Sequence, residues 1–302
     1  MIVRIYRKYI PYKYREKIYR LFIERIIILN RYFGVIIAGG FVNTFSFFFP
    51  KNALYDAYRF IGKHGVTPYP FEASLKYKNI PVEVYYDTQT NLPYVLHNCK
   101  RLYYPRQANE RKIQSSYRTL LIEQDIESSH RYVSSFEELD GKILLDIGAA
   151  EGIFTLDAIE YVTKAYIFEY KDCWIEPLKR TFKQWEDKVE IVKKYVSNKD
   201  DENTITLDTF MENREHDCIH VKMDIEGAEQ EALKGAKIFL TNRKSVSFSI
   251  CTYHKKNDAK IVSSFFEAIG YICEFTKGYI VFPYLRKAVC RGKNYVIIDQ
   301  KI

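Results

Sequence analysis

An acidic residue and two glycines stand together where an apolar stretch of the sequence ends. Asp146 lies in the apolar run 143–147, and Gly148 and Gly152 follow it four residues apart. A continuous apolar run is typical of a buried parallel strand. Glycines at the carboxyl end of such a strand let the backbone turn tightly and come close to a ligand. The pattern D-x-G-x-x-x-G therefore predicts a ligand-binding turn, and its spacing differs from the dinucleotide pattern G-x-G-x-x-G.

A second acidic residue, Glu169, ends the short apolar run 165–169 and lies 21 residues beyond Gly148. In a strand–helix–strand unit of about thirty residues, this acid projects over the same crevice as the glycine turn. There it can accept hydrogen bonds from both ribose hydroxyls of a nucleoside. Glu169 therefore predicts an adenosine-containing ligand, while a solvated Glu at a strand end is the plainer alternative.

The third motif is the most distinctive. The segment 218–229 reads C-I-H-V-K-M-D-I-E-G-A-E, and the segment 232–236 reads A-L-K-G-A. Its apolar start predicts another buried strand, and Asp224 and Glu226 follow directly after that strand. Carboxylates at this position lie at the same edge of the sheet as the glycine turn.

The three motifs together resemble those of the FkbM family of methyltransferases that use S-adenosylmethionine (SAM), over residues from about 142 to 291. The segment 206–210 also fits the family. The sequence departs from the family at Ala150, where Asn is common, and at Tyr170, where Pro is common. Neither departure removes a group that SAM needs. The resemblance implies these cofactor-binding residues: Asp146, Gly148, Ala149, Gly152, Glu169, Tyr170 and Asp224.

The resemblance also implies an acceptor site at the ends of the fourth and fifth strands. The methyl group of SAM is already activated, so transfer to a hydroxyl needs alignment and a group that takes the proton. Asp224 is the first candidate for this role, and Glu226 is the second. His254 follows the fifth strand, and its ordinary pKa suits a general base near neutral pH; a surface histidine is the alternative. Glu229 is either a further candidate or a cap of the following helix, where the helix dipole favours a carboxylate.

A polar segment, 123–132, precedes this region. Such a segment can fold over a crevice as a lid that excludes water and contacts the acceptor. On this basis His130 is predicted as a catalytic residue, with Asp125 and Tyr132 as further candidates. The alternative is a solvated helix end at which Ser128 caps the residues that follow.

The elements that must position these residues alternate along the second half of the chain. Strands are predicted at 143–147, 165–169, 189–192, 218–223 and 245–251, helices at 153–161, 174–185, 228–239 and 258–269, and a closing strand pair around 271–282 and 287–290. This alternation predicts an α/β fold with a mostly parallel, doubly wound sheet. The resemblance makes it a Rossmann-like class I methyltransferase sheet. Upstream, the segments 82–86 and 94–97 predict a β-hairpin that 101–104 continues.

The chain divides into three predicted regions. A basic helical region covers 1–75, a β-hairpin and lid-like region covers 76–139, and the SAM-dependent methyltransferase domain covers 140–302. At 302 residues the chain is long enough to bury a full enzyme core and an extension.

The positive charge is concentrated at the start of the chain. Residues 1–34 contain nine Lys and Arg and two Glu, a net charge of +7 out of +8 for the whole chain. Apolar residues recur there at helical spacing, at Ile18, Leu21, Phe22, Ile26 and Leu29. A basic amphipathic helix favours an anionic membrane surface, and a helix packed on the catalytic domain is the alternative. Nucleic acid is not an expected partner, because no recognised binding motif accompanies the charge.

The expected location is the cytoplasm, with peripheral contact at the inner face of the membrane. The apolar segment 35–49 is too short to span a bilayer, and it lacks the cleavage site of a signal peptide. The six cysteines are scattered, without C-x-x-C or zinc-like spacing, which predicts reduced thiols. Asp224 and Glu226 could together hold Mg²⁺, but no obligatory metal is expected.

The resemblance thus predicts a SAM-dependent O-methyltransferase that acts on a glycan or another small-molecule hydroxyl. The alternative is a methyltransferase fold that has lost catalysis and contacts a membrane surface. Six retained residues favour the enzyme: Asp146, Gly148, Gly152, Glu169, Asp224 and Glu226. A nicotinamide-dependent enzyme is disfavoured by the glycine spacing.

Overall fold

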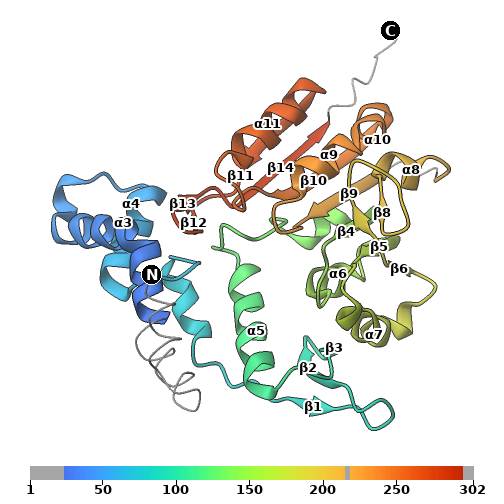
Figure 1. Cartoon of the computed structure of the whole chain (residues 1–302), viewed down its shortest axis with the longest axis horizontal. Coiled ribbons are helices and arrows are strands. Elements are labelled where there is room, and N and C mark those ends of the chain that lie inside the picture. The colour runs from blue at the N-terminus through green and yellow to red at the C-terminus, as the bar shows by residue number, and fades with distance from the viewer. Residues whose placement is uncertain (1–23, 215–217, 295–302) are drawn as a thin grey trace, which may run out of the picture. The chain divides into compact units, whose positions relative to one another are not determined.

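The computed structural model describes residues 24–214 and 218–294 (Figure 1). These residues fall into two compact units. Unit 1 contains 24–72 and 279–286, and unit 2 contains 73–278 and 287–294. No described helix is both long enough and apolar enough to cross a bilayer.

Within the described residues, a seven-stranded sheet forms the centre of unit 2, in the order β11-β14-β10-β9-β4-β5-β6. Its strands are β4 (Ile143–Ile147), β5 (Lys164–Phe168), β6 (Val189–Val192), β9 (Cys218–Met223), β10 (Ser245–Cys251), β11 (Tyr271–Phe275) and β14 (Val289–Asn294). The strands from β10 to β6 pair in parallel, whereas β14 runs antiparallel to both β10 and β11. The strand order reverses between β4 and β9, where doubly wound sheets bind their ligands.

Helices connect the strands of this sheet. They are α6 (Ile153–Ala158), α7 (Asp172–Thr181), α8 (Leu207–Met211), α9 (Glu229–Lys234), α10 (Lys237–Asn242) and α11 (Asp258–Ala268), with the short β7 (Tyr195–Val196), β8 (Thr204–Ile205) and η5 (Lys183–Trp185) between them. Every residue of β4 is buried, as its apolar sequence predicts. The core between sheet and helices includes Phe248, which stacks on Phe266 of α11. This architecture confirms the predicted α/β fold with a mostly parallel, doubly wound sheet.

Three predicted elements are divided in the structure. The predicted helix 174–185 is α7, which ends at Thr181, followed by η5. The predicted helix 228–239 is two helices, because α9 ends at Lys234 and α10 starts at Lys237. Between them Gly235 packs so closely on the chain that a Cβ would lie 2.1 Å from the carbonyl oxygen of Ser197. The predicted strand 271–282 is also wrong, because β11 stops at Phe275. Ile280–Val281 instead forms β12, which pairs with β13 (Leu285–Arg286) within unit 1.

The first part of unit 2 contains the predicted hairpin. The strands β1 (Tyr85–Tyr86), β2 (Pro93–His97) and β3 (Lys100–Tyr103) form a small antiparallel sheet, followed by α5 (Glu110–Glu123) and η4 (Phe136–Leu139). His97 at the end of β2 lies 2.8 Å from the Asp157 carboxylate of α6. Arg180 of α7 donates to Asp87 in the hairpin turn at 2.9 Å. These two contacts attach the small sheet to the helices that follow β4 and β5.

Unit 1 is built on two helices. They are α3 (Glu24–Thr44) and α4 (Ala53–His64), with η2 (Ser46–Phe48) between them; the following η3 (Glu72–Tyr77) starts at the last residue of this segment and continues into unit 2. The helices cross closely because Gly39 faces Gly62, where an added Cβ would lie 2.3 Å from the Gly39 carbonyl oxygen. Val35, Ile61 and Val281 form its small core. The side chains of the predicted amphipathic stripe at 18–29 lie outside the described residues.

Candidate active site

A cavity of about 460 Å³ opens where β4, β5 and β9 end. Six of the predicted site residues line it: Gly148, Ala149, Glu169, Tyr170, Asp224 and Glu226. Two aromatic residues from other segments, Tyr132 and Tyr253, complete the wall near Asp224. The carboxyl edge of the sheet therefore gathers the strand-end residues that the sequence predicts there.

The glycine turn after β4 is shaped by close contacts within the chain. Gly148 has a φ of 77°, and a Cβ at this position would lie 2.0 Å from the carbonyl oxygen of Asp224. Gly152 has a φ of 79°, and a Cβ there would press on Leu178 and Phe182. Because Gly148 has no side chain, the ends of β4 and β9 lie against each other. Because Gly152 has none, the start of α6 packs against Leu178 and Phe182. Gly152 itself does not line the cavity.

Asp146 lies behind the glycine turn and not in the cavity wall. Its Oδ1 forms an ion pair with Lys222 Nζ at 2.9 Å, and its Oδ2 accepts from the Thr155 hydroxyl at 2.6 Å. Lys222 also donates to the Gly148 carbonyl oxygen at 2.8 Å. Burial by itself would lower the pKa of Lys222, but the negative charges of Asp146 and Asp224 outweigh it and raise the pKa. Asp146 and Lys222 thus form a charged brace that holds the turn from below.

Glu169 reaches the cavity from the end of β5. Its Oε2 accepts from the Ala150 amide at 3.0 Å, and its Oε1 accepts from the Lys171 amide at 2.7 Å. Each carboxylate oxygen keeps a further lone pair for a ligand. The next residue, Tyr170, stacks on Tyr195 with ring centroids 3.8 Å apart, and both rings line the cavity. This wall therefore combines a carboxylate with a flat aromatic surface.

Asp224 is the centre of the opposite wall. Its Oδ2 accepts from the Tyr132 hydroxyl at 2.9 Å and lies 3.5 Å from His130 Nε2. Its Oδ1 lies 3.5 Å from His254 Nε2. Burial by itself would raise the pKa of Asp224, but the hydrogen bond and charge of His130, with the charge of Lys222, hold that pKa well below its usual range. Asp224 is therefore an anion between two histidines.

His254 is fixed by two further carboxylates. Its Nδ1 lies 2.9 Å from Glu229 Oε1, and its Nε2 lies 3.8 Å from Glu226 Oε2. Burial by itself would lower the pKa of His254, but Glu229, Asp224 and Glu226 outweigh it and raise the pKa. Glu226, with a φ of 56°, points its carboxylate to the rim, where its side chain is 81% exposed.

Glu229 is fully buried and closes the loop that precedes α9. One of its oxygens accepts from the amides of Ile225 and Gly227, at 3.0 and 3.3 Å. It thus binds amides of the loop and does not cap the amide ends of α9, which has no side-chain cap, and it also contacts the ring of His254.

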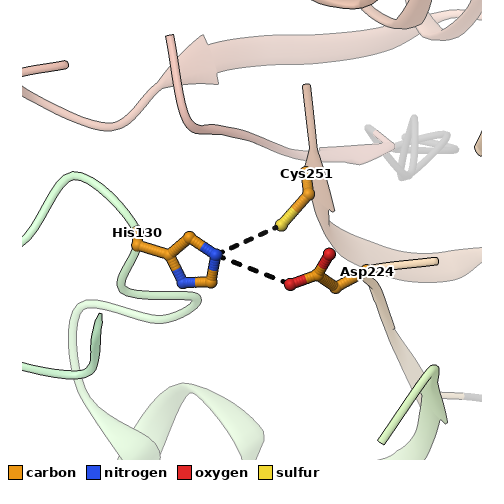
Figure 2. A group of neighbouring side chains, drawn as sticks. All are labelled: His130, Asp224 and Cys251. Carbon is orange, nitrogen blue, oxygen red and sulfur yellow. Dashed lines mark hydrogen bonds and ion pairs between the residues drawn. The ribbon is translucent and has the colours of Figure 1, made fainter. Parts of the chain in front are cut away.

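The polar segment 123–132 places His130 beside Asp224 (Figure 2), and the Tyr132 hydroxyl donates to the same carboxylate. The Ser249 hydroxyl donates to the Tyr132 carbonyl oxygen at 2.6 Å, which ties the segment to β10. Charges on Glu123 and Asp224 outweigh the burial of His130, so its pKa is raised although burial by itself would lower it. Asp125 lies elsewhere, because its carboxylate binds Lys76 at 2.6 Å and the Tyr77 hydroxyl at 2.5 Å. Ser128 accepts from the His130 amide at 3.2 Å, but both residues are buried and no helix starts there, unlike the solvated helix end of the alternative.

Three further residues complete the site without having been predicted. Lys222 braces the turn, Tyr253 lies 3.2 Å from His130 Nε2, and Glu151 is a buried acid that lines the cavity. Burial and the nearby charge of Glu123 raise the pKa of Glu151 to about 8. The position of Lys222 in the third motif is a usable sequence signal, since it lies two residues before Asp224. Glu151 and Tyr253 carry no comparable signal.

The model of one protein family, described as the methyltransferase FkbM domain, matches residues 51–280. Methyltransferase FkbM from Methylobacillus flagellatus has a similar structure, with 17% identity and a TM-score of 0.43 over 62% of this chain. The match spans only 55% of that protein's length. A methyltransferase candidate from Streptococcus mutans, in complex with S-adenosylhomocysteine (SAH), matches at 11% identity and a TM-score of 0.39, over 53% of this chain and 93% of its own. No curated protein matches the chain.

Proposed function

The chain belongs to the FkbM family of methyltransferases, and we propose from this premise that it transfers the methyl group of SAM to a hydroxyl group of a glycan or another small molecule. The observation that supports this most is the position of Asp224 between His130 and His254, directly beside the glycine turn. A hydroxyl acceptor needs a positioned group that takes its proton, and this cluster provides one.

The proposed cofactor half of the cavity contains the glycine turn, Glu169 and the Tyr170 ring. Glu169 would accept hydrogen bonds from the two ribose hydroxyls, because each of its oxygens uses one lone pair on a backbone amide. SAM carries a positive sulfonium and a positive ammonium group. The cavity lining suits such a ligand, since its other carboxylates outnumber its lysines even with Glu151 protonated at neutral pH: Glu123, Glu169, Asp224 and Glu226 against Lys171, Lys194 and Lys222.

In the proposed reaction, the acceptor hydroxyl lies between Asp224 and the sulfonium methyl group. The hydroxyl oxygen forms a bond to the methyl carbon, and the electron pair of the breaking carbon–sulfur bond leaves with sulfur. The products are a methyl ether and SAH. The proton goes to the Asp224–His254 pair, in which Glu229 fixes the histidine ring. Holding the two reactants in line contributes much of the rate enhancement in such a transfer.

The direct test supplies SAM with a labelled methyl group to the full-length protein, together with glycan and small-molecule fractions of the cells that express it. The expected product carries the label in a methyl ether, which survives mild alkali, whereas a methyl ester is hydrolysed. Label that is released by alkali, or that is found only on nitrogen, would contradict transfer to a hydroxyl. The Asp224→Asn variant measures the background labelling that occurs without the proposed catalytic carboxylate.

We also propose that unit 1 contacts an anionic membrane surface. One face of α3 and η2 carries large apolar side chains that are exposed: Phe33, Ile37, Phe41, Phe45, Phe47 and Phe48. Phe47 is 94% exposed and Phe33 is 62% exposed. Residues 1–34 of the sequence carry a net charge of +7. Exposed aromatic residues that follow a positively charged segment in the sequence suit the boundary between lipid headgroups and acyl chains.

Flotation of the full-length protein with anionic vesicles at two salt concentrations tests this contact. Binding is expected at low salt and should fall at high salt, because salt screens the attraction. The double variant Phe41→Ser/Phe47→Ser should lose binding. Ile272→Ser, which removes an exposed apolar residue from unit 2, should retain it. Failure of the wild-type protein to float at low salt would contradict the proposal.

A further inference from the structure

Three side chains from three separate segments converge beside the cavity. Figure 2 shows one ring nitrogen of His130 facing both the sulfur of Cys251 and the carboxylate of Asp224. His130 Nε2 lies 3.8 Å from Cys251 Sγ and 3.5 Å from Asp224 Oδ2. The three ligand atoms all lie within 4.8 Å of one another. His130 and Cys251 are almost fully buried, at 1% and 0% exposure.

These separations are close to those of ligands around one metal ion. Bonds of about 2.0 Å to nitrogen or oxygen and about 2.3 Å to sulfur, at tetrahedral angles, place ligand atoms roughly 3.3–3.6 Å apart. The distance from His130 to Asp224 falls within this range, and the distance from His130 to Cys251 exceeds it by only a few tenths of an ångström. They are also longer than a good direct hydrogen bond. We propose that His130, Asp224 and Cys251 form a binding site for a divalent transition-metal ion, with Zn²⁺ as the best fit.

The choice of ion follows from the ligand chemistry. Thiolate and imidazole ligands favour zinc and related transition metals, whereas Mg²⁺ prefers an all-oxygen shell. A dication held by two anionic ligands, Asp224 and the Cys251 thiolate, and by one neutral imidazole gives a centre without net charge. Such a centre suits a buried position. The positive charge of Lys222 is offset by its own ion pair with Asp146.

The fold brings the three ligands together through strand register. Ile250 pairs with Met223, so the next residues, Cys251 and Asp224, lie opposite each other at the ends of β10 and β9. His130 reaches them because the Ser249 hydroxyl holds the Tyr132 carbonyl oxygen. The spacing of these residues in the sequence gives no zinc-like pattern, which is why the sequence predicts no metal.

Three protein ligands leave one tetrahedral position for a further ligand, as in catalytic zinc sites. Asp224, Tyr132 and Tyr253 all line the cavity, so the open position is on the cavity side. This part of the inference rests on the proposed function: an acceptor hydroxyl bound there would lose its proton more readily. Asp224 then serves as a ligand, and His254 takes the proton while the hydroxyl oxygen forms its bond to the methyl carbon.

Cobalt provides the probe, because a Co²⁺ ion bound to a thiolate has a charge-transfer absorption band in the near ultraviolet. The full-length protein is stripped with a chelator and titrated with Co²⁺, and then with Zn²⁺. The band is expected with wild type, and Cys251→Ser should lose it and bind Zn²⁺ on the order of a hundredfold more weakly. Cys290→Ser is the matched control, since it removes another fully buried thiol, on the neighbouring strand β14.

The outcomes separate the metal site from the proposed function. No band with wild type, or an equal band with Cys251→Ser, overturns the site; if that variant does not fold, His130→Gln replaces it. A band that persists in His254→Ala supports this triad over the alternative group of Asp224, Glu229 and His254, and its loss there overturns the assignment. Calorimetry with SAH is run in parallel on the stripped protein. SAH binding without a band overturns only the metal site, and a band without SAH binding supports the site while overturning the proposed function.

Discussion

The two halves of the cavity are built in different ways. The proposed cofactor half is made mostly by backbone and by residues close in sequence, in the turn after β4 and at the end of β5. The other half, the proposed acceptor half, is made by side chains from three distant segments, which meet at Asp224. The halves touch where Gly148 packs against the Asp224 carbonyl oxygen. A local motif can thus fix the cofactor half, whereas the acceptor half depends on the whole fold.

The charged groups of the two halves also differ in where they lie relative to the cavity. Below the proposed cofactor half, Asp146 and Lys222 form a buried pair that supports the turn, and of the two only Lys222 lines the cavity. In the proposed acceptor half, Asp224 and Glu226 line the cavity, and the buried His254 contacts both. We therefore expect substitutions under the turn to change stability, and substitutions around Asp224 to change turnover.

The largest expected effect is on stability. Asp146→Asn leaves Lys222 buried with its closest anion removed, and breaking such a pair costs about 3–5 kcal/mol of unfolding free energy. Chemical denaturation measures the loss. Asp172→Asn is the control, because its partner is Lys193 on the surface and its side chain is 85% exposed; it should change stability by less than about 0.5 kcal/mol. Equal stabilities of both variants would show that the buried pair does not support the turn.

The second expected effect is on turnover. Asp224→Asn removes the charge at the centre of the acceptor half and should lower kcat by about a hundredfold or more, the range of a general base. Affinity for SAH should stay near that of wild type, because the cofactor half is intact. Calorimetry and single-turnover assays measure the two quantities separately. A variant that loses SAH binding but keeps its rate when saturated would reverse the assignment of the halves.

The third expected effect is a gain in stability. The Glu151 pKa is about 8 in the folded chain and about 4.5 when unfolded, so the unfolded chain releases this proton at lower pH. Stability should therefore fall as pH rises from about 4.5 to 8. Glu151→Gln should remove this slope and add on the order of 2–3 kcal/mol at pH 7. Denaturation at several pH values compares the variant with wild type, and parallel slopes would refute the burial of an ionisable group here.

The smallest expected effect is on cofactor affinity. Glu169→Ala removes the predicted partner of the ribose hydroxyls and should weaken SAH binding by about 1–3 kcal/mol, the scale of an unpaired polar group. The rate at saturating SAM should change much less. Calorimetry gives the affinity, and unchanged binding would remove Glu169 from the cofactor half.

The sequence predicts the cofactor half better than the acceptor half, and the reason is physical. Strands β4, β6, β9 and β10 start and end where their apolar runs predict, because each run must be buried. The pairing of Asp146 with Lys222 depends on the register of β4 and β9, which a single sequence does not reveal. The approach of Cys251 to Asp224 likewise depends on the register of β9 and β10.

Long-range contacts also explain the errors. Gly235 ends α9 because another part of the chain passes close to it, and helical periodicity contains no sign of that neighbour. The segment 280–281 is apolar enough for the main sheet but pairs within unit 1. In both segments, tertiary contacts override the secondary structure that the local sequence pattern predicts.

Calorimetry of the full-length wild-type protein with SAH tests the division of the cavity most directly. Saturable binding of one SAH per chain is expected, with Glu169→Ala weaker and Asp224→Asn unchanged. Absence of binding to the folded protein up to millimolar SAH would contradict the assignment of the turn after β4 as a cofactor site.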